Sequence, residues 1–181
     1  MRRKSFSVAL CGVFGALSIV CMQLGVIIPV AMYIAPALAT LLVLIAREEC
    51  GDRMAGTLYV AVSLISLLFV PDKEVAFVYV FLLGYYPLLK PHLDRIRSRV
   101  LCVVAKMGIF NLAMAVAYSL LLTLLMPGWL HRSYAPAELW GTAAIWAMGN
   151  LAFYLFDRAM LLFLRVYQIR WQPRLHRMLR H

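Results

Sequence analysis

The sequence predicts an all-α membrane protein, a bundle of six transmembrane helices that forms a single domain over residues 1–181. Hydrophobic residues make up 64% of the chain, well above their usual share in a soluble domain. Long apolar runs alternate with short polar connections, and a spanning helix needs about 20 mostly apolar residues. The runs cover residues 6–22, 25–46, 55–70, 75–89, 100–126 and 139–164.

The distribution of Lys and Arg predicts how these helices are oriented. Fourteen of the eighteen basic residues lie at the N-terminus, in the second and fourth connections and in the tail at 165–181. The remaining connections hold only Lys73 and Arg132. Short cytoplasmic loops are enriched in basic residues, so both ends of the chain are expected in the cytoplasm. There the basic residues would contact anionic lipid headgroups of the bilayer.

The first run carries small residues at helical spacing. Small residues let a second helix approach closely in lipid, either inside the bundle or as a docking face for a separate membrane subunit. These residues are Ala9, Gly12, Gly15 and Ala16.

The second run contains Pro29 and Pro36, each of which removes a backbone hydrogen-bond donor. We therefore expect residues 25–36 to form partly an outer loop or a broken helix, with the regular span beginning near Ala35.

A tight outer turn joins the third and fourth runs. Asp72 is placed to cap the fourth helix, and Glu74 lies in its first turn, where the helix dipole favours a carboxylate. Both carboxylates are equally suited to contact a ligand. The fourth run ends in the sequence GYYPLLKP at 84–91, and its two prolines are expected to disturb the helix.

The fifth and sixth runs contain charged residues. Lys106 is about 9 Å from the start of its span, and Asp157 is about 12 Å from the same membrane face at ~1.5 Å per residue. Charged groups at such depth usually face the bundle interior and pair, so we expect a Lys106–Asp157 ion pair. Asn111 and Asn150 also match in depth. Both pairs are consistent with structural contacts between helices or, alternatively, with a proton relay.

The longest outer connection, residues 127–138, is rich in aromatic and charged side chains. Aromatic residues at this depth anchor helices at the membrane interface, and together with a charge they also suit capture of a small planar or charged solute. The residues concerned are Trp129, Arg132, Tyr134 and Glu138, followed by Trp140.

The sequence contains no motif that predicts catalysis. A phosphate-binding G-x-x-x-x-G-K-[ST] loop, an H-E-x-x-H helix and a G-x-S-x-G turn are all missing, so we expect no catalytic residue, metal site or cofactor. The basic residues lie at membrane exits, which argues against binding of nucleic acid. The four cysteines form no C-x-x-C pair and are expected to be packing residues: Cys11, Cys21, Cys50 and Cys102.

Three local strings carry a family resemblance. They are Phe81–Lys90 (FLLGYYPLLK), Lys106 with Phe110–Asn111, and Tyr154–Asp157 (YLFD). With the length, the six runs, the small-residue first helix and the proline-containing second segment, they make nearly the whole chain similar to an uncharacterised bacterial group related to the substrate-binding S components of energy-coupling-factor (ECF) transporters.

The resemblance implies a multi-pass protein of the bacterial plasma membrane that binds a vitamin-like or other micronutrient solute from outside. A separate transmembrane coupling subunit and ATPase subunits would drive uptake, with the first helix as docking face. By position, the resemblance implies solute contacts at Asp72, Glu74, Tyr79, Trp129, Arg132, Tyr134, Glu138 and Trp140.

A second hypothesis is a non-transporting membrane scaffold. Small six-span proteins that resemble the shape-determining subunit of the bacterial elongation machinery share this size. The basic connector at 92–99 and the tail at 165–181 would then be surfaces that bind other proteins.

Overall fold

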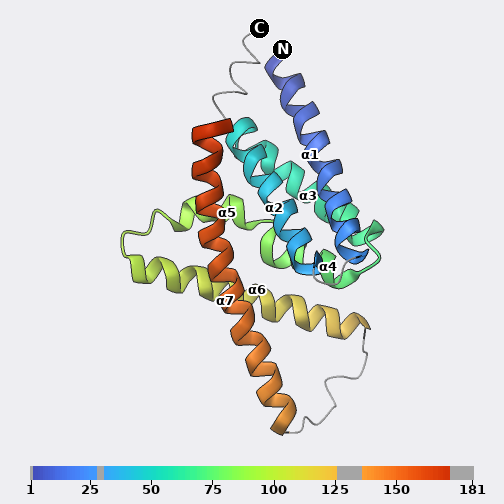
Figure 1. Cartoon of the computed structure of the whole chain (residues 1–181), viewed down its shortest axis with the longest axis vertical. Coiled ribbons are helices and arrows are strands. Elements are labelled where there is room, and N and C mark those ends of the chain that lie inside the picture. Colours follow the sequence, from blue (N-terminus) through green and yellow to red (C-terminus); the bar gives the residue numbers. More distant parts are fainter. Residues whose placement is uncertain (1, 28–30, 126–135, 172–181) are drawn as a thin grey trace. The chain divides into compact units, whose positions relative to one another are not determined.

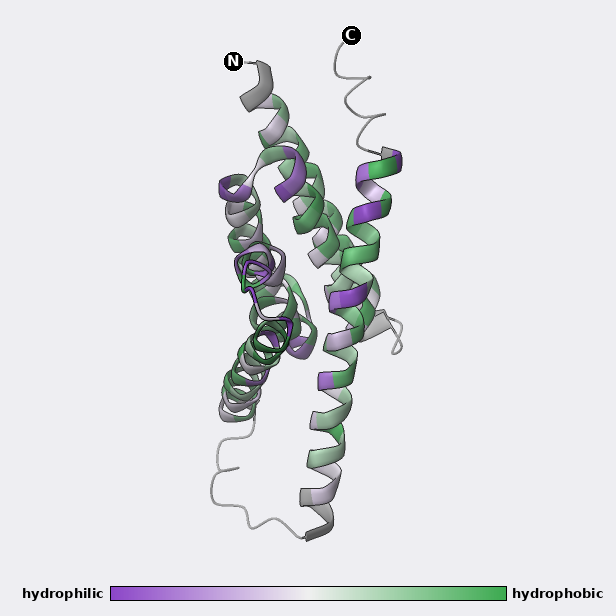
Figure 2. Cartoon of the chain, turned by 90° about the vertical axis from the view of Figure 1, so that its left-hand side faces the viewer, coloured by the Kyte–Doolittle hydropathy of each residue, from purple (hydrophilic) through white to green (hydrophobic). Residues whose placement is uncertain are grey.

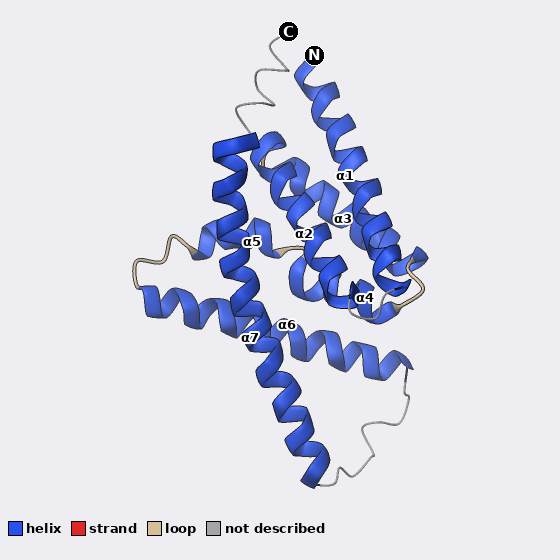
Figure 3. Ribbon diagram, in the orientation of Figure 1, coloured by secondary structure: helices blue, strands red, loops and turns tan. Residues whose placement is uncertain are grey.

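Every regular element in the described part of the chain is a helix. The computed structural model describes residues 2–27, 31–125 and 136–171, and no strand occurs within these ranges (Figure 3). The chain divides into two compact units, Met1–Arg132 and Ser133–His181. The first unit contains α1 to α6 and the π-helix η1 (Figure 1). The second contains α7 (Pro136–Val166) and the π-helix η3 (Tyr167–Trp171).

Four of the helices are long and apolar enough to cross a membrane. They are α1 (Arg2–Ile27), α3 (Asp52–Phe69), α6 (Arg99–Leu125) and α7. Hydrophobic residues cover most of their length (Figure 2), and many of their large apolar side chains are exposed. Extended exposed apolar surface of this kind is typical of helices that face lipid. These helices correspond to the first, third, fifth and sixth predicted spans.

The core of the first unit forms where α1 and α3 pack with α2 (Ala31–Cys50). Gly15 brings α1 close to α3, since a Cβ atom at this position would lie 3.3 Å from Leu58 and 3.8 Å from Val62. The helix α6 runs across the direction of α1 and α2 (Figure 1). The buried residues of this core include Met22, Ala39, Val43, Ala55, Val62 and Tyr79.

The predicted start of the second span near Ala35 is wrong. The helix α2 is already regular at Ala31 and includes Pro36. Proline in the sixth position removes one backbone bond, the one to the carbonyl four residues earlier, and leaves the rest of the helix intact. The hydroxyl of Thr40 donates to the Pro36 carbonyl oxygen at 2.8 Å.

The turns of the first unit are fixed by polar contacts. Gly51 follows α2 with a φ of 89°, which favours glycine, and the Arg47 guanidinium lies 2.6 Å from Asp52 across this turn. At the other end of α3, Lys73 Nζ donates to the carbonyl oxygens of Leu67 and Val70 at 2.8 and 3.2 Å. Both turns are therefore held to the ends of α3.

The fourth apolar run does not form one regular helix. It is divided into α4 (Lys73–Phe77), η1 (Val78–Leu83) and α5 (Tyr86–Leu93). The expected disturbance occurs at Gly84 and Tyr85, just before Pro87, which is tolerated in the first turn of α5. A methyl group on Gly84 would lie 2.7 Å from the Tyr79 carbonyl oxygen and 2.9 Å from the Tyr59 ring. Glycine is therefore required both by the Tyr79 carbonyl oxygen of η1 and by the close approach of the Tyr59 ring from α3.

Replacing Gly84 with Ala should lower the free energy of unfolding by about 1–3 kcal/mol, because the added methyl group overpacks this contact. Gly108→Ala on α6 is the matched control, since a Cβ atom there meets no atom within 4 Å. Thermal unfolding in detergent measures both variants. A Gly84→Ala protein as stable as Gly108→Ala would contradict the packing of η1 against α3.

Candidate functional site

One candidate site lies where the ends of α2, α4 and α6 meet around Glu74. The Tyr33 hydroxyl donates to Glu74 Oε1 at 3.2 Å, and Tyr118 of α6 is within electrostatic range of the same carboxylate. The helix α4 contacts both α2 and α6. A carboxylate beside two phenol rings can accept hydrogen bonds and attract a cation or an amine.

Local structure holds the Glu74 carboxylate in place. Asp72 caps α4, as the sequence predicts, by accepting a hydrogen bond from the Glu74 backbone N–H at 2.9 Å. Lys73 between them points to carbonyl oxygens at the end of α3. The Gln23 side chain of α1 also donates to the Phe69 carbonyl oxygen at 3.1 Å. Four helices are thus connected at this end of the first unit, and we call Tyr33, Glu74 and Tyr118 the Glu74 cluster.

Tyr79, which the resemblance assigns to solute binding, lies inside the core. Its side chain is 0% exposed, and its ring centroid is 6.1 Å from that of Tyr59. Its hydroxyl has no hydrogen-bond partner among the described residues, whereas the Tyr59 hydroxyl donates to the Val80 carbonyl oxygen at 2.8 Å. A buried hydroxyl without a partner costs about 1–3 kcal/mol. The Tyr79 hydroxyl can therefore still accept or donate a hydrogen bond within the helix core.

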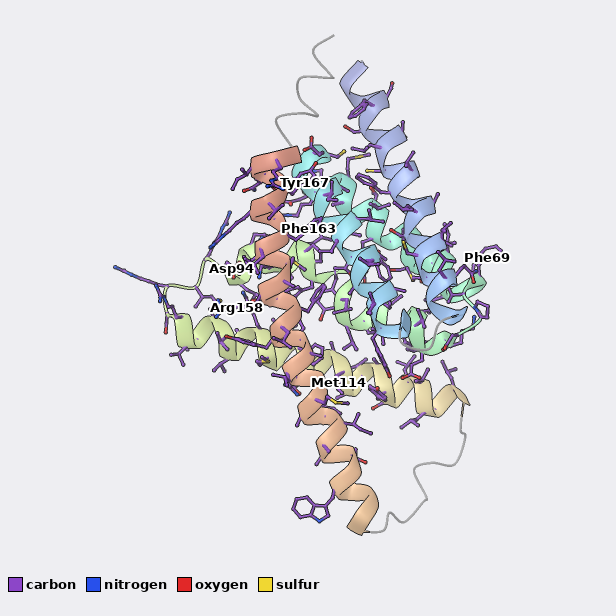
Figure 4. All side chains as sticks on the ribbon, viewed as in Figure 1. Phe69, Asp94, Met114, Arg158, Phe163 and Tyr167 are labelled. Atoms are coloured by element: carbon purple, nitrogen blue, oxygen red, sulfur yellow. The ribbon has the colours of Figure 1, made fainter. Side chains whose placement is uncertain are left out.

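A second polar cluster joins α5 to α6. Asp94, in the connector between them (Figure 4), lies 2.5 Å from Lys106 Nζ and 4.0 Å from Lys90 Nζ. Both lysines are buried, whereas 41% of the Asp94 side chain is exposed. Cys102 also donates to Asp94 at 3.8 Å. Sequence reasoning missed Asp94, because it sits in a strongly basic connector and only charges inside the apolar runs were considered for pairing.

The predicted pairs between the fifth and sixth spans stay predictions. Asp157 and Asn150 belong to the second unit, and each unit is described by itself. The side chains of both asparagines donate to a carbonyl oxygen one turn earlier in their own helices. Asn111 contacts Met107 at 2.8 Å, and Asn150 contacts Trp146 at 2.9 Å.

The remaining predicted solute contacts lie either outside the described residues or in the second unit. Trp129, Arg132 and Tyr134 lie outside the described residues, and Glu138 lies in α7 with its side chain outside the described part. Trp140 is 79% exposed on α7. Within the first unit, the structure thus brings together Asp72 and Glu74 from the predicted set and adds Tyr33 and Tyr118.

The small-residue face of α1 is divided between two environments. Ala9, Gly12 and Ala16 are exposed, and a Cβ atom on Gly12 would meet no atom within 4 Å. Gly15 instead faces α3. Gly15 therefore serves internal packing, whereas the other three residues form an open surface, and a docking face there stays a prediction.

The described residues contain no group of three or more His, Cys, Asp or Glu side chains that could hold a metal ion. Comparison with known proteins found no matching family model, no similar curated protein and no similar solved structure.

Replacing Asp94 with Asn should lower the free energy of unfolding by about 1–3 kcal/mol, because two buried lysines lose a shared carboxylate. Asp52→Asn is the control, since Asp52 also pairs with a cation but at the surface, where such a pair contributes about 0–1 kcal/mol. Chemical denaturation in detergent compares them. Equal losses in the two variants would show that burial of Lys90 and Lys106 adds nothing to the interaction.

Proposed function

We propose that this protein is the substrate-binding subunit of an ECF-type importer in a bacterial plasma membrane. It captures a vitamin-like or other micronutrient solute at its outer face. In this proposal α2 and the divided segment α4–η1–α5 complete a six-span arrangement with both ends in the cytoplasm. The connection at residues 28–30 and the turn at 70–72 then lie outside, and the Gly51 turn and the connector at 94–98 lie inside.

The observation that carries the proposal is the Glu74 cluster. Sequence position assigns Glu74 to the outer end of the fourth span and Tyr118 to the outer half of the fifth. Tyr33 from the second span donates to the same carboxylate. Tyr33 is exposed and Glu74 and Tyr118 are half-buried, so a solute can reach the cluster, and a few converging polar groups are typical of small-molecule sites. The cluster therefore supports solute binding at the end of the first unit that the charge pattern assigns to the outside.

The open face of α1 supports the second part of the proposal, assembly with other membrane subunits. Ala9, Gly12 and Ala16 are exposed on a helix that packs against α2 and α3 on its other side. Because these side chains are small or absent, the backbone of a partner helix can approach this surface closely. A coupling subunit docked there, together with cytoplasmic ATPases, supplies the energy that the chain itself has no motif to provide.

The Glu74→Gln variant should lose the solute. Wild-type protein purified from its native membrane is expected to release a small molecule on denaturation, detected by mass spectrometry. The neutral amide keeps the shape of the side chain but removes the charge, so retention should fall at least about tenfold, on the order of 1.4 kcal/mol. Glu49→Gln is the matched control. Glu49 lies at the opposite end of α2 from Tyr33, so this variant should retain the solute.

Co-isolated proteins distinguish this function from the scaffold hypothesis. A transport subunit is expected to bring down an ATPase pair and a membrane coupling protein. Purification with cell-wall synthesis factors, and with no small molecule in either the wild-type or Glu49→Gln protein, would reject solute uptake in favour of the scaffold.

The proposed topology can be tested separately with reporter fusions. Reporters that are active in only one compartment, fused after His181 and inserted after Pro71, should give opposite signals, cytoplasmic for the first and external for the second. These positions follow from the excess of basic residues on one side of the spans. An external signal from the fusion after His181 would overturn the assignment of the Glu74 cluster to the outer face.

A further inference from the structure

Two cysteines that are far apart in the sequence meet at the end of α2. Cys11 is buried in the core on α1, and Cys50, the last residue of α2, packs against the same core. The two thiols are close enough to interact electrostatically. Cys50 Sγ also donates to the Ser7 carbonyl oxygen at 3.9 Å, one turn before Cys11 on α1. The contact with Ser7 therefore places Cys50 beside the turn of α1 that leads to Cys11.

The fold holds this pair in place. The turn that follows Cys50 is fixed by Gly51 and by the Arg47–Asp52 contact of 2.6 Å. The helices α1 and α2 pack along each other, so the end of α2 cannot move away from Ser7 and Cys11 without disturbing the core. A disulfide requires two sulfur atoms held in proximity, and the Ser7 contact keeps the Cys50 thiol beside the turn of α1 that carries Cys11.

The two thiols differ in access. Cys11 is 8% exposed, whereas Cys50 is half-buried beside the exposed Gly51. The weak hydrogen bond from Cys50 to Ser7 does little to protect its sulfur atom. An oxidant arriving from solvent therefore meets Cys50 first and finds Cys11 directly behind it. Once an accessible cysteine has been oxidised to a sulfenic acid, a neighbouring thiol can condense with it to a disulfide.

We propose that Cys11 and Cys50 form an oxidisable dithiol, at which a peroxide creates a disulfide that links α1 to the end of α2. In the first step the Cys50 sulfur attacks one peroxide oxygen, the O–O bond breaks, and a sulfenic acid and one water form. In the second step the Cys11 sulfur attacks the Cys50 sulfur, the S–O bond breaks, and a second water leaves. Two thiols lose two electrons and two protons in total, and the peroxide is reduced to water.

The charge pattern assigns this dithiol to the cytoplasmic end of the first unit. Disulfides in a reducing compartment are usually transient and respond to oxidant, so the reduced pair is the resting form. The disulfide would fasten α1 to the α2–α3 turn while Ala9, Gly12 and Ala16 stay exposed on its other side. This inference does not depend on the proposed transport function.

Trypsin can detect the link, because Arg47 separates the two cysteines in the sequence. Cleavage after Lys4, Arg47 and Arg53 places Cys11 on peptide 5–47 and Cys50 on peptide 48–53. The full chain in detergent would be reduced, treated with equimolar hydrogen peroxide, blocked with N-ethylmaleimide and digested. We expect the two peptides to be joined as the main product, lighter by two hydrogen atoms than their sum, and to separate after treatment with dithiothreitol.

Matched cysteine variants identify the sulfur atoms involved. Peptide 5–47 also contains Cys21, so the link should persist in Cys21→Ser and Cys102→Ser and disappear in Cys11→Ser. Peptide 48–53 carrying N-ethylmaleimide on Cys50 after peroxide treatment of the wild-type protein would overturn the proposal, and this result needs no variant to fold. A link that survives in Cys11→Ser, or one that joins two copies of the chain, would overturn it as well.

Discussion

The close approach of α1, α2 and α3 is the constraint on which the rest of the first unit depends. Lipid tails are as apolar as the side chains of a helix, so association in a membrane relies on close packing and hydrogen bonds between helices. Gly15, Ala39 and Ala55 provide the small side chains in this core. Because these helices are close, their ends are close too, and the polar contacts at both ends follow from the packing in the middle.

The divided fourth segment shows how a run too short for a regular span is accommodated. The Tyr59 ring of α3 occupies the space beside Gly84, and its hydroxyl bonds to the Val80 carbonyl oxygen within η1. A π-helical turn widens the helix and shifts the direction of the following side chains. The segment can therefore present Glu74 to α2 and α6 at one end and Lys90 to Asp94 at the other.

Local features of the structure could be predicted from the sequence, but contacts between distant residues could not. The cap at Asp72 follows from one residue type in one position, and the long helices follow from apolar runs. The Tyr33–Glu74 contact joins residues 41 positions apart, and nothing in either segment identifies the other. Counting residues from the membrane face predicted a pair between Lys106 and Asp157. It did not identify Asp94, which lies in the same unit as Lys106 and contacts that lysine directly.

Polar groups in the first unit gather at its two ends, with the Glu74 cluster at one end and Lys90, Asp94 and Lys106 at the other. Most buried hydroxyls of the unit bond to carbonyl oxygens of their own helices, whereas those of Ser63 and Tyr79 have no partner among the described residues. Tyr79 keeps its hydroxyl in the core at a cost of about 1–3 kcal/mol, although phenylalanine would supply nearly the same ring. Unfavourable polar groups retained in a well-packed core are expected at functional sites, where stability is given up for a contact made with something else. The Tyr79 hydroxyl lies five residues after Glu74 on the same divided segment. Because its hydrogen bond is unmet within the described residues, we expect it to bond to a water molecule or to a solute that enters the core.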